Sequence, residues 1–261
     1  MTKMTAPSRS VVSHLFRNVA FAASLSVAIS ALPSPSPATQ MSAEYQSGYR
    51  AYQSGNFALA QSQWHVAANN HDPFAQYALG LLYYRGDTGP VDYKQAAKWF
   101  SQAAKANHGG ATYYIGLLYF NGHGLNYDQF RATEYFKRAL HINPHNANAA
   151  YLIGAQYFHG RGASQNFVEA AHYFRIAAKE NMHAAQFMFG AMLERGWGVP
   201  QNYAESYYWL KRASLGAISL PTGAEEENPM DAKAAVSALE PRLRPEEIKR
   251  INDRLTNEAA G

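Results

Sequence analysis

Residues 111–139 read ATYYIGLLYFNGHGLNYDQFRATEYFKRA, and residues 149–177 follow the same pattern as AAYLIGAQYFHGRGASQNFVEAAHYFRIA. Each stretch has a glycine inside an apolar segment, then a Gly-x-Gly turn, and then an alanine followed by an aromatic pair. With one further copy on each side, the shared glycines are Gly80, Gly116, Gly154 and Gly190. They are separated by 36, 38 and 36 residues. A period this regular predicts a protein built from stacked structural repeats.

The apolar residues within each copy have the spacing of helices. Ala111, Ile115 and Tyr119 lie at positions i, i+4 and i+8, which places one buried stripe on a helix. Gly116 beside this stripe allows another helix to approach closely, and that contact must offset a helix-propensity cost of about 1 kcal/mol relative to alanine. The paired glycines of the turn can take positive φ and so reverse the chain. Each copy is therefore predicted to form an antiparallel helix pair that needs neighbours on both sides.

The series of motifs resembles the Sel-one-like repeat family, a branch of the tetratricopeptide superfamily. The resemblance rests on the helix glycine, the Gly-x-Gly turn, the alanine and aromatic residues of the second helix, and an acidic or amide residue before that helix. These acidic or amide residues are Asp92, Asp128, Asn166 and Asn202. The resemblance covers residues 74–216 and implies an all-α fold, a right-handed α-solenoid of antiparallel helix pairs. The first copy departs from the pattern, because it has Gly86-Asp87-Thr88-Gly89 in place of Gly-x-Gly.

The rest of the chain divides around this array. The four repeats are expected at about 74–109, 110–145, 148–181 and 184–216. Residues 43–71 look like a shorter tetratricopeptide-type hairpin in front of them. Residues 217–261 are expected to form capping helices, one near 232–239 and one that starts at Pro245, where proline and acidic residues suit a first helical turn. Such caps are expected because the terminal repeats of a solenoid otherwise expose an apolar face.

The first 38 residues have the layout of a secretory signal peptide followed by a Pro/Ser-rich tract. Basic residues precede an acid-free apolar run of 14 residues, which is short for a membrane-spanning helix of about 20 residues. Cleavage is predicted after Ala31 or after Ala38, and an uncleaved anchor is the alternative. A lipid anchor is excluded because the chain has no cysteine. The mature chain is therefore expected to be exported and to lack a membrane span. The periplasm is the expected compartment, and secretion into the medium is the alternative.

The charge of the chain argues against nucleic-acid binding. Its formal net charge is +4, but Lys3, Arg9 and Arg17 contribute three of these charges and no acidic residue precedes Glu44. The rest of the chain is therefore nearly neutral, and it contains no cluster of Lys and Arg and no recognition motif. A nucleic-acid partner is not expected.

No catalytic or metal-binding pattern stands out. His141 and His145 have the i, i+4 spacing of a helical metal pair, but Pro144 between them should end the helix. The chain has no Gly-x-Ser-x-Gly elbow and no phosphate loop, and its Gly-x-Gly turns follow helices where a dinucleotide site requires a strand. We therefore expect no catalytic residues, no cofactor and no metal.

The first helices of the repeats offer a candidate binding surface. In tetratricopeptide-like superhelices the first helix of each pair lines the concave face, so positions three before and four after the helix glycine should share one side. The predicted partner-binding residues are Tyr77, Tyr84, Tyr113, Phe120, Tyr151, Phe158 and Phe187, with Arg85 and Arg195 on the rim. They could bind an extended peptide or a partner helix. The alternative is that these aromatic residues only pack between neighbouring first helices.

The sequence thus predicts a noncatalytic scaffold or adaptor of the bacterial cell envelope that binds a protein or peptide. One alternative is an envelope enzyme that acts on cell-wall fragments. Another is a secreted factor that binds a host protein.

Overall fold

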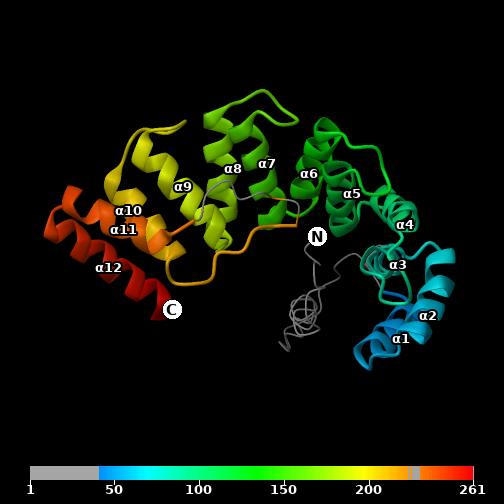
Figure 1. The fold of residues 1–261 in the computed structure, drawn as a ribbon. Helices are drawn as coiled ribbons and strands as arrows, with labels where there is room; N and C mark the ends of the chain where they lie inside the picture. The colour runs from blue at the N-terminus through cyan, green and yellow to red at the C-terminus, as the bar shows by residue number, and fades with distance from the viewer. Residues whose placement is uncertain (1–40, 223, 225–229, 261) are drawn as a thin grey trace, which may run out of the picture. The chain divides into compact units, whose positions relative to one another are not determined.

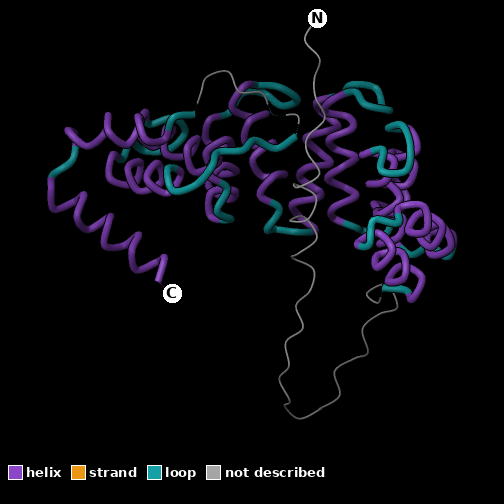
Figure 2. The backbone as a smooth tube through the Cα atoms, turned by 60° about the horizontal axis from the view of Figure 1, so that its bottom comes forward, coloured by secondary structure: helices purple, strands orange, loops and turns teal. Residues whose placement is uncertain are grey.

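The computed structural model describes residues 41–222, 224 and 230–260. The predicted signal peptide and its cleavage sites lie outside the described residues. The described part is helical, and its α-helices pack in chain order (Figures 1 and 2). They are α1 (Ala43–Gln53), α2 (Phe57–Asn69), α3 (Pro73–Arg85), α4 (Tyr93–Lys105), α5 (Gly109–Asn121), α6 (Gln129–Ile142), α7 (Ala147–His159), α8 (Phe167–Lys179), α9 (His183–Arg195), α10 (Tyr203–Ala213), α11 (Ala232–Leu239) and α12 (Pro245–Ala260).

The predicted all-α solenoid is confirmed. Each odd-numbered helix up to α9 packs against the helix that follows it, and each even-numbered helix up to α8 packs against the next pair. At the C-terminal end α10 packs against both α11 and α12. Tyr208 of α10 donates a hydrogen bond to the Glu258 carboxylate of α12 at 2.8 Å, and Arg212 pairs with the same carboxylate at 2.7 Å. These contacts hold the last helix on the final repeat.

The helix glycines make room for one large side chain in each repeat. A Cβ atom added to Gly116 would lie 2.6 Å from a ring carbon of Phe136, which is itself fully buried. A Cβ atom added to Gly154 would likewise come too close to the ring of Phe174, and one added to Gly190 would come too close to the side chain of Leu210. Because the side chain lies directly on the glycine, the first and second helices of a pair approach more closely than any larger residue would permit.

The acidic and amide residues between the paired helices are N-caps. The side-chain oxygens of Asp92, Asp128, Asn166 and Asn202 each accept a hydrogen bond from a backbone N–H in the first turn of the second helix. Such caps satisfy donors that the helix cannot pair internally and typically contribute about 1 kcal/mol each. The repeated polar residue of the sequence motif therefore fixes where each second helix begins.

The first helices are capped less uniformly. Asp72 and Asn146 cap α3 and α7 through their side-chain oxygens, whereas His108 caps α5 by accepting the Ala111 N–H on Nδ1 at 3.1 Å. The imidazole of His108 also stacks on Tyr77 with 4.4 Å between ring centroids. Burial lowers the pKa of His108 from its ordinary value of 6.5 to about 4.

This cap is expected to make stability depend on pH. Below pH 6.5 the unfolded chain protonates His108, whereas the folded chain keeps it neutral down to about pH 4. The contribution is therefore complete above pH 6.5 and is lost as the pH falls towards 4, with an upper limit of about 3 kcal/mol. Urea unfolding at pH 7.5 and pH 5 should show a lower free energy of unfolding at pH 5. The difference in this free energy between the two pH values should be smaller in His108→Asn, which copies the Asn146 cap. An unchanged pH dependence in His108→Asn would assign the effect to other groups.

Candidate peptide-binding groove

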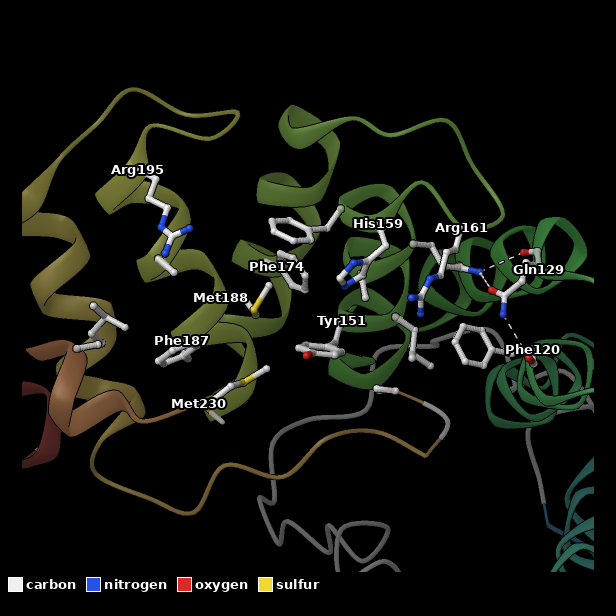
Figure 3. A pocket seen from close by; sticks show the side chains of 18 of the residues that line it. Phe120, Gln129, Tyr151, His159, Arg161, Phe174, Phe187, Met188, Arg195 and Met230 are labelled. Carbon is white, nitrogen blue, oxygen red and sulfur yellow. Dashed lines mark hydrogen bonds between the residues drawn. The ribbon is translucent and has the colours of Figure 1, made fainter. Parts of the chain in front are cut away.

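A cavity of about 880 Å³ opens along the first helices of the second, third and fourth repeats. The residues directly after two of the helix glycines, Ala155 on α7 and Ala191 on α9, are small and lie along it. Aromatic side chains, among them Phe120, Tyr151, Phe174 and Phe187, also line it (Figure 3). The predicted binding residues that line the cavity are Phe120, Tyr151, Phe158, Phe187 and Arg195. We call this cavity the groove.

The predicted residues do not all have the same exposure. Tyr151 is 3% exposed, although it lines the groove, whereas Phe120, Phe158 and Phe187 are half-buried. The ring of Phe158 contacts Phe167 at 5.4 Å and Trp197 at 5.7 Å between centroids. This aromatic residue, four after the helix glycine, thus bridges two repeats and still lines the groove.

The remaining predicted residues lie together around α3 and α5, outside the lining of the groove. Tyr113 is 8% exposed and packs against Phe136 at 5.7 Å, while Tyr84 meets the ring of Tyr114 edge-on at 5.0 Å. Burial raises the pKa of Tyr77, Tyr84 and Tyr113 above its usual range. Arg85 donates a hydrogen bond to the hydroxyl of Tyr52 at 3.3 Å. Partner binding by these residues stays a prediction.

One end of the groove carries a buried polar network that the sequence reasoning missed. Gln156 is 2% exposed, and its amide nitrogen donates to the side-chain oxygen of Gln129 at 2.9 Å. Thr133 donates to the carbonyl oxygen of the Gln156 side chain at 2.9 Å. A signal was present, because the other repeats have Leu82, Leu118 and Met192 at this position. A buried amide with its partners satisfied fixes the local arrangement of α6 against α7.

The rim of the groove carries charge. The guanidinium of Arg195 stacks over Trp197 at 4.6 Å from the ring centroid, and Arg195 is exposed. His159 and Arg161 lie on the rim at the third repeat (Figure 3). Glu194, next to Arg195 in the chain, also lines the groove. An aromatic floor with a mixed, mainly basic rim suits a peptide better than a small apolar ligand.

Among residues 41–222, 224 and 230–260, no three His, Asp or Glu side chains come together as metal ligands. In the same part of the chain no helix is both long and apolar enough to cross a membrane.

Comparison with known proteins gives the family. The Sel1 repeat model matches residues 73–108, 110–141, 147–182 and 183–216, which together make up more than half of the chain. This chain belongs to the Sel1 repeat family. The match assigns one repeat to each helix pair from α3/α4 to α9/α10.

Solved structures of Sel1 repeat proteins share the fold. A Sel1 repeat protein from Oxalobacter formigenes aligns with a TM-score of 0.62 and 24% identity, covering 77% of this chain and 87% of that one. The protective antigen c5321 of uropathogenic Escherichia coli aligns with a TM-score of 0.65 and 22% identity. That alignment covers 80% of this Sel1 repeat chain but only 43% of c5321. Comparison with curated proteins found no match.

Proposed function

We propose that this Sel1 repeat protein is a noncatalytic interaction module that binds a peptide segment of a partner protein in the groove. The observation that supports this most strongly is the cavity of about 880 Å³, which is lined by aromatic residues from three successive first helices. Half-buried aromatic rings supply apolar contact area at a small entropic cost, and Arg195 supplies a hydrogen-bonding rim. Because residues 1–38 have the pattern of a signal peptide, we place the protein in the bacterial cell envelope, in the periplasm.

The test is chemical crosslinking in cells with a variant that fills the groove. Ala155→Arg would place a long side chain among Phe158, Tyr151 and Ala191, so it should abolish capture of the partner in the periplasmic fraction. Asn148→Arg is the control, because Asn148 lies on the same helix, is exposed and is not part of the groove lining. It introduces the same charged side chain away from the groove, so it should capture the partner as the wild type does.

Both variants should melt cooperatively, which would show that capture is not lost through unfolding. Equal capture by the wild type and both variants would move binding to another surface. Turnover of cell-wall fragments by the purified chain would replace the scaffold with the enzyme alternative, and recovery only from culture fluid would favour the secreted alternative.

A further inference from the structure

A stretch of the chain's own backbone packs beside the groove, on the apolar cluster that also supplies part of the groove lining. After α10 the chain runs back past α9 and α8 towards α7 (Figures 1 and 2). We call residues 217–222 and 224 the strap. The strap is not helical, and it carries no charged residue.

The strap has the burial pattern of a bound peptide. Ile218 and Leu220 are half-buried, while Ala217 and Ser219 between them are exposed. This alternation is typical of an extended chain that presents every second side chain to a surface. Pro221 is buried, and the Ala224 N–H donates to its carbonyl at 3.0 Å to make a tight turn.

The contacts of the strap reach across two repeats. Ile218, Leu220 and Ala224 pack against the apolar cluster that α7, α8, α9 and α10 form together. Ala224 also packs against the neighbouring cluster built from α5, α6 and α7, and it lines the groove. Met230, just before α11, lines the groove as well (Figure 3). The strap therefore meets the groove at Ala224 and covers apolar surface next to it through Ile218 and Leu220.

We infer that the groove and the apolar cluster beside it are built for an extended, uncharged, aliphatic peptide segment with a proline, and that the strap, which packs on that cluster, acts as an internal competitor. This inference rests on the function proposed above. A tethered segment competes at a high effective concentration, because it never diffuses away from its site. A partner segment must therefore displace the strap or bind next to it. Substitutions that weaken the contacts of the strap should raise the affinity of the chain for such a segment.

The competition can be measured without knowing the partner. The probe is a fluorescent synthetic peptide with the sequence of residues 216–224, and binding to the full-length mature chain is followed by anisotropy. The strap variant is Leu220→Ser/Pro221→Ser/Ala224→Ser, which removes apolar contacts and leaves the helices of the paired array, α1 to α10, unchanged. We expect the probe to bind this variant at least about tenfold more tightly than it binds the wild type.

Two controls define the site. Ala155→Arg placed on the strap variant should remove binding of the probe, whereas Asn148→Arg should not. Equal affinity of the wild type and the strap variant would overturn the competition. Absence of binding to a folded strap variant would overturn the assignment of the ligand class. Neither result would contradict the proposed interaction function, because that function is tested separately by partner capture. Conversely, a failed capture would not change the outcome of the peptide measurement.

Should the triple substitution unfold the chain, Leu220→Ser alone serves the same purpose. It changes one half-buried side chain outside the helix pairs. The probe should still bind this single variant more tightly than the wild type, and an unchanged affinity with an unchanged melting curve would count against the strap as a competitor.

Discussion

Gly198→Ala is expected to destabilise the protein by about 2–4 kcal/mol, more than the loss of a glycine in a surface turn usually costs. Gly198 has φ +69°, and a residue with a Cβ atom pays about 1 kcal/mol or more in that conformation. An added Cβ would also overlap the carbonyl oxygen of Phe167 and lie 2.5 Å from the backbone nitrogen of Val168. Backbone atoms at the start of α8 cannot rotate away, so overpacking adds about 1–3 kcal/mol.

Gly196→Ala is the matched control for this prediction. Gly196 has nearly the same φ, +72°, but the nearest atom to an added Cβ is the Gln201 Cβ at 3.5 Å. Only the conformational cost of about 1 kcal/mol should appear. Urea unfolding of both variants measures the difference. Similar losses for the two would mean that the backbone at the start of α8 relaxes to admit a Cβ atom on Gly198 at little cost.

Phe136→Ala is expected to cost about 4 kcal/mol, because it removes a fully buried ring and leaves a cavity between α5 and α6. Gly116→Ala alone should cost up to about 2 kcal/mol, because its methyl group would lie 2.6 Å from that ring while alanine regains about 1 kcal/mol of helix propensity. In the double variant the new methyl group enters space that the ring has left. The double variant should therefore be more stable than the sum of the two losses predicts.

Chemical unfolding of the four proteins in this cycle supplies the coupling energy. Phe136→Leu is the conservative control, because the fourth repeat naturally pairs Gly190 with Leu210. It should lose much less stability than Phe136→Ala does. Strict additivity in the double variant would show that the glycine and the ring act independently.

The repeat array could be predicted from the sequence because its signals are local and occur four times. Gly116, Phe136 and Asp128 each have counterparts at fixed spacing, and each has a physical role within one helix pair: close approach, core filling and capping. The first repeat, which has Gly86-Asp87-Thr88-Gly89 in place of Gly-x-Gly, departs from the motif only within this turn. Gly86 still ends α3 with φ +72°, whereas a Cβ atom on Gly89 would meet nothing within 4 Å.

The candidate groove was predictable only in part. Helical arithmetic places Tyr113, Tyr151 and Phe187 at equivalent positions, yet Tyr113 and Tyr151 are buried and Phe187 is half-buried. The exposure of a side chain depends on which residues of the neighbouring repeat and of the C-terminal segment pack against it. Spacing within one helix carries no record of those neighbours.

By itself, the sequence determined the helix pairs, their register and their order, because period, capping and glycine placement are properties of each segment and its nearest neighbour. Tertiary structure alone decided where the groove opens and what packs beside it. The strap has no period and no helical spacing, and its path follows an apolar surface that exists only after α5 to α10 have packed together. A surface assembled from several helices cannot be read from the segment that covers it.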